Sequence, residues 1–504
     1  MSLRSKSNIL KYSSKSNRTF VVIPGLNHPK VVDLKQTKGL EHYEERMLFF
    51  LFLLKYPNTR IVYVTSKDFN DDLFAYYVGL ISKDEIETVK RLKRLVHIEI
   101  NSDAKGISLA EKILSDKKYI NQIKKQIVDP ESTYLRSYNP TDEESLIAKK
   151  LGVPLFGSKT KNAYYGTKSG CRKIFREAKI NMLDGFEDIK KIDDLYLSVA
   201  KLIQKHPDYD KLVIKVNYSS AGKGNAVLNI SELLSDAEID PKVATLRKIK
   251  KVVTNEMSKY LIYQNPDYNF ASFSSRFNLI GGIVELFAPG EIVSSPSAQI
   301  LVMRKGKFEI VSTHEQILGG PDGQLYLGCE FPADQDYRAD LIKSSRKIAT
   351  KMAEKEVLGN FAIDFVVCKI NGKSVIYPIE INYRKGGTTH PFRIAYYLTE
   401  SEYDVKNDIL VDNECRPICY HSMEFIESEK YKKIKPMELI DLVRYSKISF
   451  DKKNNEGVVV YMPGMISKFG RFGAICIAHT PEKAAEYFKK LVKLVNTYAD
   501  SKIK

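Results

Sequence analysis

Four polar side chains within residues 361–391 have the types and the spacing to do chemistry together. The segment reads FAIDFVVCKINGKSVIYPIEINYRKGGTTHP, with Asp364 sixteen residues before Glu380, and with Asn382 and Arg384 at the next alternate positions. Alternate residues of a strand share one face, so Glu380, Asn382 and Arg384 should point the same way. Carboxylate and amide oxygens suit magnesium, which proteins hold with one or two carboxylates plus substrate phosphates, and the planar fork of an arginine grips phosphate. The sequence therefore predicts that this protein handles a nucleoside triphosphate.

A hairpin would bring the first carboxylate to the same face. The strand-like runs 361–370 and 374–382 flank the dipeptide Asn371-Gly372, and Asn-Gly is the strongest short-range hairpin signal. If the two runs pair, Asp364 reaches the face that carries the other polar side chains. The hairpin is thus the element that must position the predicted site.

A small-residue loop supplies a second candidate contact with phosphate. The strand-like run 211–217 leads into YSSAGKGN at 218–225, where glycines let backbone N–H groups approach phosphate oxygens and Ser219 and Ser220 add hydroxyl donors. Lys215 alternates with apolar residues, and burying it is costly unless it meets an anion; an exposed face is the alternative. The loop matches neither the P-loop nor the dinucleotide-binding pattern, and a plain hairpin turn is the competing interpretation.

Weaker patterns lie on either side of that loop. Lys168 and Arg172 are four residues apart and share a helix face, where they either contact phosphate or are merely solvated. In GGIVELF, Glu285 and the backbone of Leu286 could hydrogen-bond an adenine. A strand with an exposed glutamate is the alternative for that segment.

Two short segments are candidates for substrate recognition. His314 and Glu315 lie in STHEQILGGPDG, where a metal or acid/base pair is one interpretation and a substrate-recognition loop is the favoured one. Asn27 and His28 follow the first strand-like run, at the carboxyl end where α/β sheets bind ligands. A simple turn is an equally good interpretation of that second loop.

The composition limits the classes of protein to consider. The chain has 504 residues, which predicts two to four domains, and its longest apolar run, residues 47–54, is too short to cross a bilayer. Six scattered cysteines show no zinc-site pattern. The net charge of +17 suits ATP and acidic substrates, whereas nucleic-acid binding is disfavoured because the lysines are spread along the chain without a recognised module. We expect a cytoplasmic protein.

The alternation of strand-like and helical patterns predicts an α/β fold. Residues 1–18 are polar and are expected to be a disordered lead-in. Residues 19–155 alternate strand and helix as in a parallel sheet, and 156–400 form a second region. Residues 401–435 mix charge and proline with weak periodicity and are expected to connect this region to a last α+β unit at 436–504.

The order of these parts resembles the ATP-grasp superfamily over residues 145–395. The similarity is strongest in AKKLGVPLFGS, TKSGCRKIFREAKI, VIKVNYSSAGKGNAV and PIEINYRKGGTTHP. The pieces KGNAV, STHEQILGGPDGQLYLGC and EINYRKGGTTHPF are most similar to the pheganomycin-type peptide ligases, which also carry a C-terminal domain. The resemblance implies an ATP-grasp fold with lobes at 156–285 and 286–400, an N-terminal parallel-sheet pre-ATP-grasp domain and a small α+β C-terminal domain.

The resemblance also implies a role for each candidate residue. ATP would lie between the two lobes, with Lys168 and Lys215 on its phosphates or adenine and with Arg384 and Lys215 as the catalytic residues. Some relatives have a lysine where this chain has Leu286, so the contact with adenine there would be through the backbone only. The nucleotide contacts would come from Lys168, Lys215, Ser219, Ser220, Gly222, Gly224, Asn225, Glu285 and Leu286, and the substrate contacts from His314, Glu315, Gly386, Gly387 and Thr388.

The implied cofactors and reaction follow from the same resemblance. Asp364, Glu380 and Asn382 would hold two magnesium ions, with manganese as an alternative. The carboxylate of an amino acid or peptide would attack the γ-phosphoryl group of ATP, and an amine would displace phosphate from the resulting acyl phosphate. The partners would be small molecules rather than a membrane or nucleic acid, with a homodimer as one option. The competing hypotheses are another ATP-grasp chemistry, and an ATP-binding scaffold or sensor without turnover.

Overall fold

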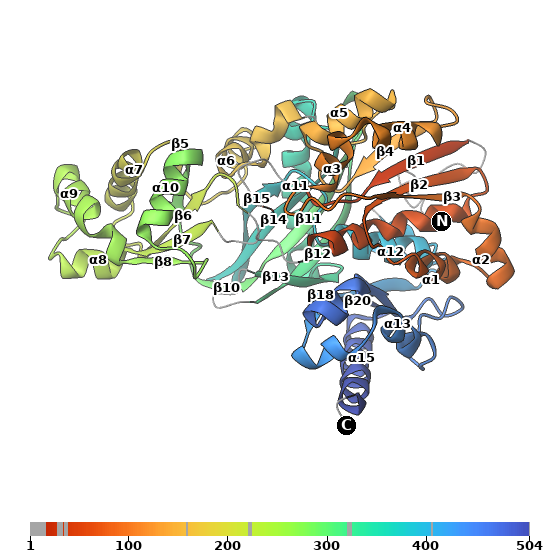
Figure 1. Ribbon diagram of the computed structural model, residues 1–504. Coiled ribbons are helices and arrows are strands. Elements are labelled where there is room, and N and C mark those ends of the chain that lie inside the picture. Colours follow the sequence, from red (N-terminus) through yellow and green to blue (C-terminus); the bar gives the residue numbers. More distant parts are fainter. Residues whose placement is uncertain are drawn as a thin grey trace.

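The computed structural model describes residues 17–27, 34, 39–157, 160–219, 224–319, 325–404 and 407–502. Of the expected lead-in at 1–18, only residues 17 and 18 are among the described residues. His28 also lies outside them. The described residues form three sheets, which Figure 1 shows with their covering helices. In the described part of the chain, no helix is long and apolar enough to cross a membrane.

The N-terminal region forms a parallel sheet, as the alternating pattern predicted. Its strands lie in the order β3-β2-β1-β4, and every neighbouring pair is parallel. The apolar run 47–54 is buried inside the helical segment η2, which is wound as a 3₁₀ helix. The elements are β1 (Arg18–Ile23), η2 (Leu40–Lys55), β2 (Thr59–Ser66), α1 (Asp72–Ile81), α2 (Glu85–Leu92), β3 (Leu95–Ile100), α3 (Leu109–Ser115), α4 (Lys117–Lys125), β4 (Thr133–Ser137) and α5 (Asp142–Leu151).

The next part of the chain forms a lobe of its own, at the left of Figure 1. Its five strands are antiparallel and lie in the order β5-β9-β6-β7-β8, and helices α7 to α10 contribute to its separate hydrophobic core. The elements are η3 (Thr160–Gly166), α6 (Lys168–Glu177), β5 (Gly185–Ile189), α7 (Ile192–Lys205), β6 (Lys211–Val216), β7 (Asn225–Asn229), α8 (Ile230–Asp236), α9 (Leu246–Glu256), η4 (Met257–Lys259), β8 (Leu261–Tyr263), α10 (Phe270–Ile280) and β9 (Gly282–Leu286).

A large sheet of eleven strands follows. Its main path is β10-β14-β11-β12-β13-β18-β17-β16, with β15 beside β14, β20 beside β18, and β19 beside β20. The elements up to the end of the predicted second region are β10 (Glu291–Ser294), β11 (Pro296–Val302), η5 (Arg304–Gly306), β12 (Phe308–Gly319), β13 (Leu325–Phe331), α11 (Gln335–Glu354), β14 (Gly359–Ile370), β15 (Lys373–Asn382) and α12 (Thr389–Leu398).

The prediction of a connecting segment at 401–435 is wrong, whereas a small C-terminal α+β unit is present. The segment 401–435 is not a connection, because its strand β18 pairs with β13 and with β20 in the large sheet. The C-terminal unit therefore completes this sheet instead of building a separate one. The elements are β16 (Glu402–Asp404), β17 (Ile409–Val411), β18 (Pro417–Glu427), η6 (Glu429–Lys433), α13 (Pro436–Arg444), β19 (Gly457–Tyr461), η7 (Pro463–Met465), α14 (Ile466–Phe469), β20 (Arg471–Ala478) and α15 (Pro481–Ser501).

The predicted hairpin at residues 361–391 is present. Strands β14 and β15 pair antiparallel, and the turn residues Asn371 and Gly372 have φ values of 50° and 77°, as a two-residue turn of type I′ requires. A bulge in β15 after Pro378 places Glu380 directly across from Asp364. Since a bulge re-aims the side chains that follow it, this irregularity sets the two carboxylates opposite each other.

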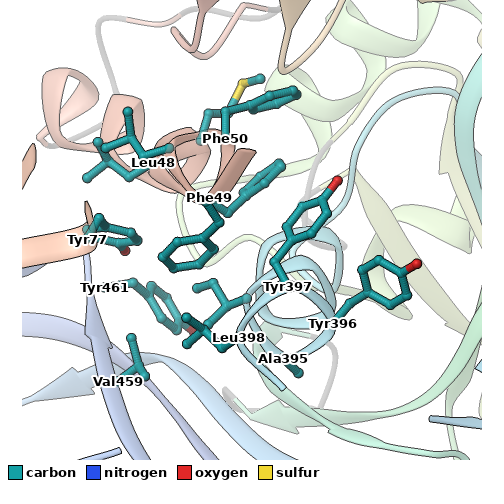
Figure 2. Packing of buried hydrophobic residues seen from close by; sticks show 14 of the residues in the cluster. Leu48, Phe49, Phe50, Tyr77, Ala395, Tyr396, Tyr397, Leu398, Val459 and Tyr461 are labelled. Atoms are coloured by element: carbon teal, nitrogen blue, oxygen red, sulfur yellow. The ribbon is translucent and has the colours of Figure 1, made fainter. Parts of the chain in front are cut away.

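One hydrophobic core joins three regions that are far apart in the sequence. Figure 2 shows Phe49 of η2, Leu398 of α12 and Tyr461 of β19 in the same buried cluster. The N-terminal and C-terminal regions are thereby packed against the large sheet. They can contribute fixed side chains to a site on that sheet.

Candidate active site

A cavity of about 1330 Å³ lies between the five-stranded lobe and the large sheet. Side chains of the N-terminal and C-terminal regions also line it. Most of the residues singled out from the sequence lie on its wall: Lys215, Ser219, Gly224, Asn225, Glu285, Leu286, Asp364, Glu380, Asn382, Arg384, Gly386, Gly387 and Thr388.

The hairpin brings two carboxylates and an amide together on one wall of the cavity. Asp364 and Glu380 are cross-strand neighbours, and Asn382 Nδ2 donates a hydrogen bond to Asp364 Oδ2 at 2.6 Å. Lys168 does not line the cavity, but its ammonium group forms an ion pair with Glu380. Lys168 lies at the first turn of α6, whose N-cap Thr167 accepts a hydrogen bond from Gly170 N.

The two carboxylates differ in their electrostatic surroundings. Burial and the negative charge of Glu380 raise the pKa of Asp364 to about 7. Burial would also raise the pKa of Glu380, but the neighbouring Lys168 and Lys215 hold it below its ordinary value. At neutral pH, one carboxylate is therefore ionised while the other is close to its titration point. A cation between them would favour the ionised form of both.

These oxygen ligands suit a magnesium ion that also binds substrate phosphates, rather than a metal ion held by protein side chains alone. In the described parts of the chain, no group of three or more His, Cys, Asp or Glu side chains could hold a metal ion. Asp364, Glu380 and Asn382 instead offer two carboxylates and one amide oxygen. Magnesium is commonly bound by one or two carboxylates together with the phosphates of a substrate, so this donor set suits a magnesium–phosphate complex.

Lys215 meets an anion, as its apolar neighbours predicted, and that anion belongs to the chain. Its Nζ donates to Glu285 Oε1 at 2.6 Å, while Arg172 forms an ion pair with the other oxygen of Glu285 and donates to Leu183 O at 3.0 Å. Burial would raise the pKa of Glu285, but Lys215 and Arg172 hold it below its ordinary value. Arg172 is thus neither solvated nor on the cavity wall, because it is buried in this ion network.

The loop after β6 is described only at its two ends. Ser220 and Gly222 lie outside the described residues, whereas Ser219, Gly224 and Asn225 line the cavity. A Cβ on Gly224 would lie 2.5 Å from side-chain atoms of both Val216 and Ser219. Close packing within the loop therefore accounts for this glycine.

The backbone N–H of Leu286 is bonded within the lobe, and a contact of the rest of its backbone with adenine stays a prediction. Leu286 lines the cavity at the end of β9, but its N–H donates to Asp184 O at 2.9 Å. The next N–H, that of Phe287, donates to Lys211 O at 3.1 Å. A base bound here therefore cannot use these two donors without displacing them from hydrogen bonds within the lobe.

Arg384 and the small residues after it line the cavity beside the carboxylates. Arg384 Nη1 donates to the adjacent Lys385 O at 3.0 Å. A Cβ on Gly387 would lie 2.4 Å from the ring of Tyr326, which explains the glycine there. In the described part of the chain, the buried Thr388 Oγ1 has no hydrogen-bond partner, so it is free to bond a ligand.

The predicted substrate contact at His314 and Glu315 is wrong. His314 is buried in the hydrophobic core, where its Nε2 lies 2.6 Å from Tyr420 Oη and its ring packs near Phe331. Glu315 accepts hydrogen bonds from Asp334 N and from a tyrosine hydroxyl. Neither residue lines the cavity. Both belong to the structure around β12.

The position of His314 predicts a pH effect on stability. Burial lowers the pKa of His314 to about 3, while the unfolded ring titrates near the ordinary value of about 6.5. Between these values the unfolded chain binds the extra proton, so the free energy of unfolding falls as pH decreases. We expect His314→Gln to remove a contribution on the order of 2 kcal/mol between pH 7 and pH 5, as measured by chemical denaturation of both proteins. An unchanged pH dependence would contradict the buried neutral ring.

The wall made by the N-terminal and C-terminal regions was not anticipated. It includes Tyr43 and Arg46 of η2, Glu424 of β18 and Arg471 of β20. The buried positions of β18 alternate from Tyr420 onward. The sequence shows no matching apolar pattern, because the polar residues Ser422 and Glu424 occupy two of these buried positions.

Comparisons with known proteins agree with this architecture. Residues 161–406 match the family model described as IQCH-like, ATP-grasp, and residues 438–491 match the model of the PGM1 C-terminal domain. The L-propargylglycine–L-glutamate ligase of Streptantibioticus cattleyicolor is 22% identical over 458 residues, which cover 90% of this chain and 89% of that protein.

Solved structures show the same fold at low sequence identity. A complex of biotin carboxylase from Campylobacter jejuni with β-γ-ATP has a TM-score of 0.55 and 12% identity, and the match covers 96% of this chain and 95% of that one. The biotin carboxylase domain of 2-oxoglutarate carboxylase from Hydrogenobacter thermophilus, solved with MgADP, ADP and bicarbonate, has a TM-score of 0.51 and 11% identity, with 94% and 89% covered. The ATP-grasp fold expected from the sequence is thus confirmed.

Proposed function

We propose that this chain is an ATP-dependent ligase that joins a carboxylate to an amine and releases ADP and phosphate. The observation that carries this proposal is the wall formed by the hairpin, where Asp364 and Glu380 face each other beside Asn382 and Arg384. The relative that spans most of this chain is named as a ligase of two amino acids, which supports an amino acid or peptide as the acid.

The nucleotide would lie between the five-stranded lobe and the hairpin wall. Lys215 and the described ends of the loop after β6 face the cavity from one side, and Arg384 faces it from the other. The fold relatives were solved with ATP-like or MgADP ligands, which supports ATP and magnesium as cofactors here. We propose that Asp364, Glu380 and Asn382 hold magnesium, with two ions as the family resemblance implies.

The residues of this chain would act mainly by placing charge. The acid's carboxylate oxygen attacks the γ-phosphorus, ADP leaves, and an acyl phosphate forms; the amine nitrogen then attacks the acyl carbon, and phosphate leaves. Bound magnesium supplies neutralisation of charge on the β- and γ-phosphate oxygens. Arg384 would hold the transferred phosphate and the oxyanion of the second step, while Lys168 fixes the position of Glu380 through their ion pair.

A paired substrate screen tests the proposal. The full chain is incubated with ATP and magnesium and with amino acids and short peptides in all pairs, and phosphate release and product mass are measured. We expect ADP, phosphate and a product whose mass equals that of the two substrates minus water. ATP binding without turnover for any pair would favour a scaffold or sensor, and bicarbonate-dependent turnover would favour another ATP-grasp chemistry.

The remaining expectations concern the cellular setting of the reaction. Small molecules, an acid and an amine, are the partners that the cavity suits. The cytoplasmic location and the homodimer stay predictions from the sequence.

A further inference from the structure

The cavity continues beyond the hairpin to a wall that the proposed nucleotide site does not use. Arg46 and Tyr43 come to this wall from η2, and Glu424 comes from β18. Arg46 Nη1 donates to Tyr138 Oη at 3.3 Å, and its guanidinium lies 4.2 Å from the centre of the Tyr43 ring. These residues give the wall a fixed cation, two phenol rings and a carboxylate, beside the ion pair of Arg471 with Glu427.

Glu424 is the carboxylate with an oxygen left over for a ligand. Only 2% of its side chain is exposed, and Arg46 forms an ion pair with its Oε1. Within the described parts of the chain, its Oε2 accepts no hydrogen bond. Because Glu424 lines the cavity, the donor that would satisfy Oε2 can come from a bound molecule.

Two neighbours place Glu424 close to the proposed reaction centre. The positive charge of Arg384 acts on Glu424 and favours its ionised form. The charge of Glu424 in turn raises the pKa of Tyr326, whose ring lies close to Gly387. Glu424 therefore lies near Arg384 on the part of the cavity wall that the N-terminal and C-terminal regions form, where a second substrate can bind if ATP fills the part between the five-stranded lobe and the hairpin.

We propose that Glu424 binds the attacking amine and accepts its proton. This inference rests on the proposed ligase function and names the general base of its second step. The substrate ammonium group donates a hydrogen bond to Glu424 Oε2 and transfers a proton to it. The free amine nitrogen then forms a bond with the acyl carbon, the bond from that carbon to the phosphate oxygen breaks, and phosphate leaves with the electron pair and takes the second proton from the nitrogen.

The surroundings of Glu424 suit a carboxylate that accepts a proton from an ammonium group. Burial raises the pKa of Glu424 above its ordinary value, although Arg46, Arg384 and Arg471 each oppose this rise. The other titratable groups that interact with Glu424 are a thiol and three phenols, which are Cys329, Tyr43, Tyr326 and Tyr461. Burial raises the pKa of Tyr43, Tyr326, Cys329 and Tyr461 as well, so these four groups stay protonated at neutral pH and leave Glu424 as the proton acceptor among them.

The test compares two nucleophiles in Glu424→Gln. An amine substrate arrives protonated and needs a base, whereas hydroxylamine is already uncharged at neutral pH and traps the acyl phosphate as a hydroxamate. We expect Glu424→Gln to lower kcat for amide formation about 10²-fold, the scale of general-base catalysis, while hydroxamate formation from the acid and ATP stays within about twofold of the original chain. The wild-type pH profile should rise through the pKa of the base, and this limb should disappear in the variant.

Controls separate catalysis from folding. Glu456→Gln removes a buried glutamate of the C-terminal region that pairs with Lys483 at 2.5 Å away from the cavity wall, and both activities should be kept. Because Glu424→Gln leaves Arg46 without its anion, the double variant Glu424→Gln/Arg46→Met removes the unpaired charge and should fold while still failing in the amine step.

Each outcome has a separate meaning. Equal loss of hydroxamate and amide in both Glu424 variants, with the chain folded, would show a structural role and overturn the assignment of the base. Unchanged amide formation with an unchanged pH profile would overturn it as well. A wild-type chain that forms no hydroxamate with any acid would refute the proposed ligase function itself.

Discussion

Glu380→Gln should lower kcat for ADP release at least about 10³-fold while the chain stays folded. The substitution removes one of the two charges that face each other on the hairpin wall. A metal ion that stabilises the charge of the transferred phosphate lowers the activation free energy by several kcal/mol. A loss of about 4 kcal/mol corresponds to a rate lower by a factor of about 10³. The glutamine keeps the size of the side chain and an oxygen acceptor for Lys168, so the fold should persist. Steady-state ADP release and thermal unfolding measure the two effects.

A matched glutamate of the same sheet serves as the control. Glu330 lies in β13 and pairs with His421 Nδ1 at 2.8 Å, away from the cavity. We expect Glu330→Gln to keep its activity. Full activity in Glu380→Gln would refute the proposed metal site, and equal losses in both variants would show that the effect is not specific to the cavity.

Arg384→Ala should lower kcat about 10²–10³-fold, which is the usual cost of removing one donor that stabilises a developing negative charge. The side chain lines the cavity next to the paired carboxylates, and its described hydrogen bond is only to the adjacent Lys385 carbonyl. Its donors are therefore available to a ligand. Because the interaction would strengthen in the transition state, the loss should appear in kcat more than in the KM for ATP. Arg384→Lys should recover part of the activity, since it keeps the charge and loses the planar fork.

An arginine outside the cavity checks that this loss is local. Arg338 donates to the backbone oxygens of Ala333 and Asn407 and does not line the cavity. Arg338→Ala should keep kcat even if it lowers the unfolding temperature. A loss confined to KM in Arg384→Ala would place this residue in ground-state binding instead of catalysis.

Local signals in the sequence were enough to predict the hairpin. Asn371 and Gly372 supply the positive φ values that the turn needs, and strand alternation places Asn382 near Asp364. The bulge after Pro378 was not predictable, because it depends on how β14 and β15 fit each other. It is nevertheless the feature that sets Glu380 across from Asp364.

Contacts between distant segments account for the features that were missed. The cost of burying Lys215 predicted an anion, but only the folded lobe shows that Glu285 and Arg172 complete that network. The strand β18 escaped prediction because Ser422 and Glu424 occupy buried positions where apolar residues would reveal a strand. Their partners come from η2 and from β20, hundreds or tens of residues away.

Isotope transfer from the acid tests the central claim most directly. The acid identified in the paired screen is labelled with ¹⁸O in its carboxylate and incubated with the full chain, ATP, magnesium and the amine. An acyl phosphate must carry one carboxylate oxygen into phosphate, so we predict one ¹⁸O atom in inorganic phosphate for each amide formed, together with unlabelled ADP. Recovery of the label in AMP, or phosphate that carries no label while amide accumulates, would contradict the ligase mechanism proposed for this chain.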